Sequence, residues 1–512
     1  MHKSSRWEIL VFVLIIATAV FFRFYNLGDT PPGLYPDEAM NGINALAAND
    51  TGGYQIFYPE NNGREGLFIG MQALSLKMFG IHPWALRGVS AVIGVLTVIG
   101  LYMLAKELFD WRIAALSSFA MAVSFWHVNF SRIGFRAIMV PFILVYAFHF
   151  LWKGIKSSRL AYFFWAGVFG GLGFYTYTSY RIAPLIAIIL FAAYWRYLKN
   201  DFGHSKYEHA RNQLLRGFAL LMLTAFFVAL PMGIYLFQNP ELLNNQPSLS
   251  VFNQPDPLSA LGQSVGRTLA MFNFTGDWNA RHNIPGAPML PWPIGIFFII
   301  GFIKELGHWL ERRHRHFSPL HTFLFAWFII MLLPGFLSTQ APHALRTIGV
   351  LPVVMLFTGR GVWWLFKAIG AWRDTTHPAE QYHSRHTTDP ALILAMVLLL
   401  LALGSYEYNR YFKVWAKDAE TAGAFNQNYV DIAQQINALP TSVPKYVIVK
   451  APTVTFRLPD QDKELPVSAA TVMFLTDTVS QEKRAAKHVV YLSPEQVFDA
   501  RIARRAKIFR IE

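Results

Sequence analysis

The sequence predicts an α-helical polytopic membrane protein that carries a small α/β domain at its C-terminus. Hydrophobic residues make up 54% of the 512 residues and charged residues only 15%, which is too apolar for an ordinary soluble domain. The apolar residues come in long uninterrupted runs. After Tyr411 the composition changes to that of a soluble domain.

The apolar runs predict eleven transmembrane helices. A helix needs roughly 20 apolar residues to cross the bilayer, and with somewhat shorter runs included we expect spans at residues 8–24, 88–105, 113–128, 135–152, 160–177, 182–198, 217–237, 291–310, 318–338, 347–366 and 390–405. The first run has no small-residue cleavage site after it, which indicates a retained helix. The segment Leu67 to Phe79 is too short and too polar to span, and we expect it to lie at the membrane interface.

Loop charges predict the orientation. If the N-terminus is cytoplasmic, the inner loops carry about twice as many Lys and Arg as the outer loops, as the positive-inside rule requires. The outer loops then hold Arg64, Lys77, Arg87, Arg132, Arg136, Arg181, Arg267, Arg281 and Arg346. We therefore expect a multi-pass protein of the plasma (inner) membrane with two long outer loops, 25–87 and 238–290.

The net charge of +14 does not indicate nucleic-acid binding, because the basic residues lie in short segments between apolar runs. The chain has no cysteine, which excludes disulfides and Cys-ligated metals.

We expect a transmembrane domain over residues 1–410 and an extracytoplasmic domain over 411–512. The outer loop 238–290 is rich in Asn, Gln, Pro and Gly, which favours an irregular surface loop over a helix. In the C-terminal domain, helical spacing from Phe425 to Leu439 predicts a helix that stops before Pro440. Strands are expected at residues 446–449, 472–475, 489–492 and 508–511, and Ser493 and Pro494 look like the start of a last helix.

The stretch YPDEAMNG, Tyr35 to Gly42, places two adjacent carboxylates, Asp37 and Glu38, just past the first apolar run. An acidic pair at a bilayer surface is a candidate active site, in which a carboxylate takes a proton from an attacking hydroxyl. The commoner explanation of such a pair at a helix start is a cap or a favourable partner of the helix dipole.

Four arginines gather on the same predicted face, although the positive-inside rule disfavours them there. Guanidinium groups bind phosphate bidentately, and a phosphate on a lipid carrier would fit Arg132, Arg136, Arg181 and Arg346. Taken singly, each arginine is also explained as an interfacial side chain. The nearby tyrosines, Tyr177 among them, are explained as an aromatic belt, and His343 as an ordinary loop residue.

Several motifs resemble the membrane glycosyltransferases of the GT-C superfamily, of the protein O-mannosyltransferase and aminoarabinose transferase type. The matching stretches cover about residues 7–412 in one order and are PDEAMNG (36–42), GREGLFIGMQALSLKMFG (63–80), HPWALRGVSAVIGVLTVIGLYMLAKELF (82–109), SRIGFRAIMVPF (131–142), TYTSYRIAP (176–184) and LPGFLSTQAPHALRTIGVLP (333–352).

The resemblance implies an inverting transfer of a sugar from a polyprenyl-phosphate-linked donor to an acceptor hydroxyl. Asp37 falls on the catalytic acidic position, with Glu38 as its partner or as a metal ligand. Arg64 falls where relatives place a basic residue near the lipid phosphate. Relatives often have a Pro-Pro pair where this chain has Glu65 and Gly66, so Glu65 is a candidate second acidic group.

From these observations we expect a glycosyltransferase of the hexosyl- or pentosyl-transferring kind, acting on a protein, lipid or glycan acceptor. Asp37 and Glu38 are the expected catalytic pair, and the donor phosphate is assigned to Arg64, Arg132, Arg136, Arg181 and Arg346. Glu65, Tyr177 and His343 are the candidate substrate contacts. A divalent cation, Mg²⁺ or Mn²⁺, is compatible with this site but not required, and no metal ligand is assigned beyond the alternative role of Glu38.

Two functions of other classes fit the same composition. A lipid-linked glycan flippase would place ionisable residues near mid-membrane and often shows inverted repeats, whereas here the charges gather at one face. A membrane assembly protein would use its outer domain only to bind partners.

Overall fold

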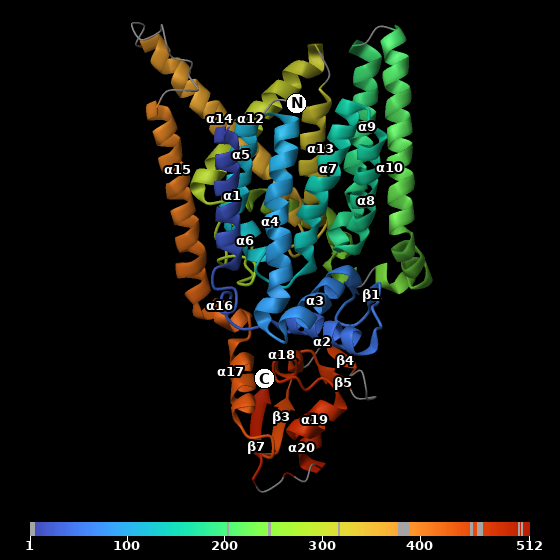
Figure 1. The fold of residues 1–512 in the computed structure, drawn as a ribbon, viewed down its shortest axis with the longest axis vertical. Helices are drawn as coiled ribbons and strands as arrows, with labels where there is room; N and C mark the ends of the chain where they lie inside the picture. Colours follow the sequence, from blue (N-terminus) through green and yellow to red (C-terminus); the bar gives the residue numbers. More distant parts are fainter. Residues whose placement is uncertain are drawn as a thin grey trace.

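The computed structural model describes residues 6–201, 204–243, 247–315, 318–376, 390–450, 454–457, 464–499, 502 and 505–511, which form a bundle of long helices above a smaller domain (Figure 1). In this described part, nine helical segments are long and apolar enough to cross a membrane. They contain α1 (Arg6–Phe24), α4 (Pro83–Leu108), α7 (Met139–Ser157), α9 (Pro184–Asp201), α10 (His204–Gln238), α12 (Trp292–Arg315), α13 (Pro319–Phe336), α14 (Leu351–Thr376) and α15 (Pro390–Tyr408).

The remaining two predicted spans are shorter helices, α5 (Trp111–Val123) and α8 (Leu160–Leu172). Helix α5 packs against α1, α4 and α14, and α8 packs against α7 and α10, so both stand inside the bundle. The predicted fold class, a helical polytopic membrane protein, is confirmed. Nine helices of the described residues are long enough to span, against about eleven expected, and the other two expected spans are these shorter helices. Segment Leu67 to Phe79 forms α3 (Gly66–Phe79), which lies at the lower end of the bundle in Figure 1.

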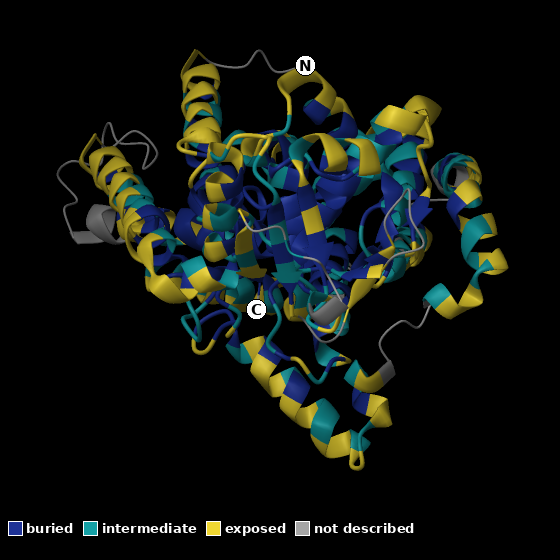
Figure 2. Ribbon diagram, turned by 90° about the horizontal axis from the view of Figure 1, so that it is seen from below, coloured by how far each residue is buried: buried dark blue, intermediate teal, exposed yellow. Residues whose placement is uncertain are grey.

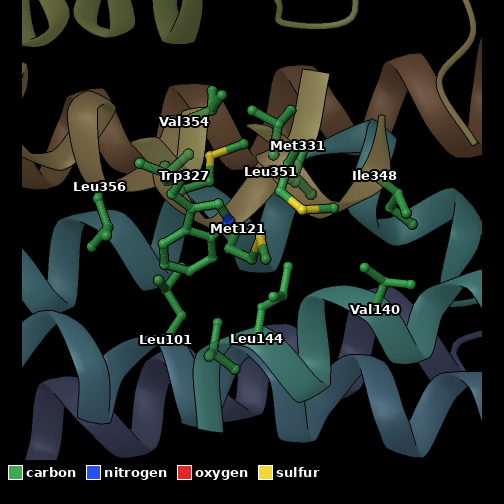
Figure 3. Packing of buried hydrophobic residues seen from close by; sticks show 14 of the residues in the cluster. Leu101, Met121, Val140, Leu144, Trp327, Met331, Ile348, Leu351, Val354 and Leu356 are labelled. Atoms are coloured by element: carbon green, nitrogen blue, oxygen red, sulfur yellow. The ribbon is translucent and has the colours of Figure 1, made fainter. Parts of the chain in front are cut away.

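The bundle core is built from large apolar side chains of several helices. Trp327 of α13 is fully buried and donates its indole N–H to the carbonyl of Gly349 at 2.9 Å, and Leu101, Leu144 and Met331 surround it (Figure 3). Exposed residues lie on the outer helices (Figure 2). Many of them are apolar, as expected for a surface that faces lipid.

The two ends of the bundle differ in what they carry. The N-terminus lies at the upper end in Figure 1 and the C-terminal domain at the lower end. Helix α2 (Pro36–Thr51), the short helix α6 (Phe125–Phe130) and helix α11 (Pro257–Ala270) connect the long helices. Helix α11 corrects the expectation of an irregular loop over 238–290. Asp256 caps it by accepting from the N–H of Ser259 at 3.2 Å, and Pro257 opens it, a start signal that composition alone does not reveal.

A small hairpin follows α2 and positions two predicted site residues. Strands β1 (Phe57–Tyr58) and β2 (Arg64–Glu65) pair antiparallel, with Tyr58 opposite Arg64. The turn between them has positive φ at Asn61, Asn62 and Gly63. Asn and Gly are the residues that tolerate this conformation, so the local sequence permits the tight turn that returns Arg64 and Glu65 to α2.

The C-terminal domain has a parallel sheet of order β6-β3-β7, made of β3 (Lys445–Val449), β6 (Val489–Leu492) and β7 (Lys507–Ile511), and a hairpin of β4 (Thr455–Arg457) and β5 (Glu464–Pro466). Its helices are α16 (Ala419–Ala424), α17 (Gln427–Ala438), α18 (Ala469–Leu475), α19 (Gln481–Lys487) and α20 (Gln496–Asp499). The prediction of a strand at 472–475 is wrong, because this segment belongs to α18. A short apolar run does not distinguish a buried strand from a buried helix.

The C-terminal domain shares its core with the helices that carry the predicted site. One cluster of buried residues joins Met40 and Ile43 of α2 to Val472 and Phe474 of α18. The hydroxyl of Thr471 donates to the carbonyl of Leu34, just before α2, at 2.9 Å. The C-terminal domain therefore packs directly against α2 and supports it from below in Figure 1.

Candidate active site

A cavity of about 600 Å³ opens at the lower end of the bundle, where α2, the β1–β2 hairpin and the helix ends of the bundle meet. Its other walls come from the 3₁₀ turns η1 (Arg136–Ile138) and η3 (Thr178–Ile182), from α13 and from the segment after α13. Its charged lining residues are Asp37, Glu65, Arg64, Arg136, Arg181 and Arg346. Four guanidinium groups against two carboxylates make this a site suited to an anion.

Asp37 is the carboxylate of the acidic pair that reaches the cavity. It is half-buried, near the start of α2, and its Oδ1 accepts from the side-chain amide of Asn61 at 2.7 Å. Asn41, one helical turn later on the same face, also lines the cavity. A partly exposed carboxylate held by one amide is well placed to accept a proton from a bound hydroxyl.

Glu38 does not line the cavity. Its side chain is fully buried, and its two oxygens bind Nε and a terminal nitrogen of Arg87 at 3.0 and 3.1 Å. The N–H of Gly134 donates to the same carboxylate at 2.8 Å. Consecutive helical residues point about 100° apart, so Glu38 faces the protein interior while Asp37 faces the cavity. The geometry thus supports a structural role for Glu38 in place of the expected catalytic or metal-binding role.

Arg64 lies deep in the cavity wall. Its terminal nitrogens donate to the side-chain oxygens of Asn41 at 2.7 Å and Asn44 at 2.6 Å, and its buried Nε has no hydrogen-bond partner within the protein. Burial, together with the charge of Arg136, lowers the pKa of Arg64 to about 10, so the guanidinium remains protonated at neutral pH. Arg64 is therefore a positively charged side chain held in place by two asparagines. Its Nε–H is a hydrogen-bond donor that no acceptor of the protein uses.

Glu65 bridges two of the cavity arginines. Its Oε2 accepts from Nε of Arg136 at 2.5 Å, and its Oε1 lies 4.0 Å from a terminal nitrogen of Arg181. The Arg136 guanidinium also lies over the ring of Tyr177, 5.3 Å from its centroid. These contacts hold both guanidinium groups at the cavity wall. Glu65, Arg136, Arg181 and Tyr177 are thus brought together as predicted.

Arg346 reaches the cavity from the opposite wall. One terminal nitrogen donates to the hydroxyl of Ser338 at 2.8 Å and the other to the side-chain oxygen of Gln340 at 2.9 Å. Apolar side chains also line the cavity and include Ile182, Leu242, Leu333, Pro334 and Leu337. The cavity lining is therefore partly basic and partly apolar.

Besides Glu38, two other predicted site residues lie outside the cavity lining. Arg132 is fully buried, does not line the cavity, and donates to the backbone carbonyls of Phe22, Tyr25, Asn26 and Thr30. It ties the end of α1 to the loop before α2. His343 is also outside the cavity lining and lies beside Asp277 and His282. Burial and the charge of His282 lower the pKa of His343 to about 3, so its imidazole is neutral at pH 7.

Several residues that hold the site were not identified from the sequence. Asn61 binds Asp37, Asn41 and Asn44 bind Arg64, and Arg87 neutralises Glu38. Only Asn41 carried a usable signal, because it lies four residues after Asp37 and a helix places both on one face.

The described residues contain two groups of side chains that could hold a metal ion: Asp277, His282 and His343, and Glu305, His308 and His321. Neither group includes a residue that lines the cavity.

The fold and the site define the class: a polytopic membrane protein with a carboxylate and a set of arginines at one end of its helix bundle. Residues 68–210 match the model of the dolichyl-phosphate-mannose-protein mannosyltransferase family. The chain is 26% identical over 202 residues to YkcB of Bacillus subtilis (strain 168), provisionally named a mannosyltransferase, and this alignment covers 37% of the chain and 27% of YkcB.

Solved structures show the same fold. ArnT from Cupriavidus metallidurans, bound to undecaprenyl phosphate, matches 99% of this chain and 90% of its own length, with a TM-score of 0.56 and 12% identity. The Archaeoglobus fulgidus oligosaccharyltransferase AglB, in complex with an inhibitory peptide and a dolichol-phosphate, matches 96% of this chain, with a TM-score of 0.55 and 14% identity. The match spans 65% of AglB. These findings confirm the predicted resemblance to GT-C glycosyltransferases.

Proposed function

We propose that this protein transfers a sugar from a polyprenyl-phosphate-linked donor to an acceptor hydroxyl, with inversion at the anomeric carbon. The observation that carries the proposal is the convergence of Asp37 and four arginines on one cavity at the lower end of the bundle. The ArnT and AglB structures hold polyprenyl phosphates, which supports a donor of the same class here.

The arginines bind the donor phosphate in this mechanism. Arg64 offers a buried N–H without a protein partner, and Arg181 and Arg346 add charge from two other walls. Guanidinium groups stabilise the charge that develops on a phosphate as it leaves. The apolar wall next to Arg346 would contact the first isoprenoid units of the donor.

Asp37 acts as the general base. The acceptor hydroxyl gives its proton to the Asp37 carboxylate while its oxygen forms a bond to the anomeric carbon. The bond between that carbon and the phosphate oxygen breaks, and polyprenyl phosphate departs with the electron pair. A single displacement of this kind inverts the anomeric configuration.

The outer face of the plasma membrane is the proposed location. Among the described residues, the Lys and Arg that the positive-inside rule assigns to the cytoplasm belong to segments at the upper end of the bundle, opposite the cavity. Within the described residues the cavity charges gather at one end of the bundle, and this observation favours a transferase over a flippase.

The test is transfer by purified protein from a panel of radiolabelled polyprenyl-phosphate hexoses and pentoses. Asp37→Asn should lower the rate by about 10²- to 10⁴-fold, because general-base catalysis typically contributes that much. Asp50→Asn is the matched control, since Asp50 is an exposed residue of the same helix that does not line the cavity. It should retain the full rate.

Equal rates for wild type and Asp37→Asn would refute the assignment of the base. Absence of transfer from every donor would refute the proposed activity. The anomeric configuration of the product, read by NMR, tests inversion separately.

A further inference from the structure

Two loops, one of which also lines the cavity, bring together three side chains of the types that bind metals. Asp277 and His282 belong to the loop between α11 and α12, and His343 belongs to the segment between α13 and α14. One ligand atom of each residue lies within 4.8 Å of the ligand atoms of the other two. Residues about 60 positions apart in the chain thus converge on one point.

Hydrogen bonds within the protein account for only two of the three side chains. Asp277 Oδ2 pairs with Nδ1 of His282 at 2.9 Å and accepts from the N–H of Ala344 at 2.8 Å, and its Oδ1 accepts from the N–H of Asn279 at 2.9 Å. The Nδ1 atom of His343 is completely buried and has no hydrogen-bond partner. An unsatisfied buried nitrogen costs about 1–3 kcal/mol, so this atom indicates a missing partner.

We propose that Asp277, His282 and His343 bind a Zn²⁺ ion. Two imidazole nitrogens and one carboxylate oxygen are a donor set that Zn²⁺ takes, with a fourth position left for water. Mg²⁺ prefers oxygen donors throughout.

Binding requires a small local adjustment. Ligand atoms of a tetrahedral zinc site lie roughly 3.3 Å apart, as follows from metal–ligand distances of about 2.0–2.1 Å. The two imidazole rings have centroids 5.1 Å apart, so the three side chains move closer together by rotation when the ion enters.

The ion would connect a loop that carries a cavity residue to a loop that contacts the segment just before Asp37. Arg346, three residues after His343, lines the cavity. Arg281, next to His282, lies over the ring of Tyr35, 3.9 Å from its centroid, and Tyr35 is two residues from Asp37. The role is structural, and the proposal holds whether or not the chain transfers sugars.

The test measures metal content directly. Protein purified without a polyhistidine tag is stripped with chelator, incubated with ZnCl₂ or MgCl₂, desalted, and analysed for metal per chain by mass spectrometry. The background variant is His308→Ala, which removes a residue of the other ligand group, Glu305, His308 and His321. In this background we expect one Zn²⁺ per chain and no retained Mg²⁺.

Adding His343→Ala to the background should abolish zinc retention. The bonds of Asp277 to His282 and to the N–H of Ala344 stay intact, so the variant should fold, and equal unfolding temperatures of the two metal-free proteins verify this. Zn²⁺ should raise the unfolding temperature of the background protein only. No bound zinc in the background protein, or equal zinc with and without His343, would overturn the proposal.

Discussion

Two neighbouring acidic residues have different partners in this protein. Asp37 lines the cavity and accepts from Asn61, whereas Glu38 is fully buried against Arg87. Arg87 also donates to the carbonyls of Pro31 and Gly33 at 2.8 Å. The Glu38–Arg87 pair therefore fixes the loop that leads into α2, and through it the position of Asp37.

Glu38→Gln tests this structural role. Removing one partner of a buried ion pair leaves the other charge uncompensated, which typically costs about 3–5 kcal/mol. We expect the unfolding temperature in detergent to fall clearly below that of the wild type. Asp477→Asn is the control, because the Lys483–Asp477 pair is partly exposed, and exposed pairs contribute about 0–1 kcal/mol.

A wild-type unfolding temperature for Glu38→Gln, combined with lost transfer activity, would contradict the structural role. It would return Glu38 to the catalytic role that adjacency to Asp37 first indicated.

At the scale of elements, the contact between α2 and α18 joins the helix that carries Asp37 to the C-terminal domain. Gly42 of α2 faces the ring of Phe474, and a Cβ added at Gly42 would lie 2.5 Å from Cε2 of that ring. Phe474 is fully buried, so its ring has little room to move. Glycine is required here for close approach of the two helices.

Gly42→Ala should destabilise the protein by about 1–3 kcal/mol, the usual cost of overpacking, although alanine is the better helix former. Gly70→Ala in α3 is the matched control, because nothing lies within 4 Å of its added Cβ. There alanine should be neutral or stabilising by up to about 1 kcal/mol. Thermal unfolding of both variants measures the difference.

A double-mutant cycle with Phe474→Leu tests whether the cost of Gly42→Ala comes from the contact with the Phe474 ring. Replacing the ring removes the atoms that a Cβ at position 42 would meet, so Gly42→Ala should cost less in the Phe474→Leu background. Equal costs in both backgrounds would show that the two helices do not restrict each other through this contact.

At the scale of the whole molecule, the orientation in the membrane is open to a simple test because the chain has no cysteine. Single cysteines can be introduced at Ser157, an exposed residue at the upper end of α7, and at Glu482, an exposed residue of α19. In intact cells an impermeant maleimide should label Glu482→Cys and should label Ser157→Cys only after permeabilisation. The reverse pattern would place the cavity in the cytoplasm.

Local properties of the sequence determined the helices and the class of protein. Hydropathy marks a membrane span residue by residue, because the bilayer requires every span to be long and apolar. The same reasoning placed Asp37, Arg64, Glu65, Arg136, Tyr177, Arg181 and Arg346 at one end of the bundle. The motifs around them indicated a resemblance to GT-C glycosyltransferases, and the comparisons confirm that resemblance.

Only the tertiary structure decided which of these charged residues line the cavity. Arg132 and Arg136 lie on one short segment, yet Arg132 binds backbone carbonyls while Arg136 pairs with Glu65. The apolar run at 472–475 became a helix because α2 and α17 surround it. Each of these outcomes depends on residues that are distant in the chain. A buried charge must be paired or hydrogen-bonded, and a short apolar run must be covered by other apolar residues. Only the tertiary structure brings those partners next to them.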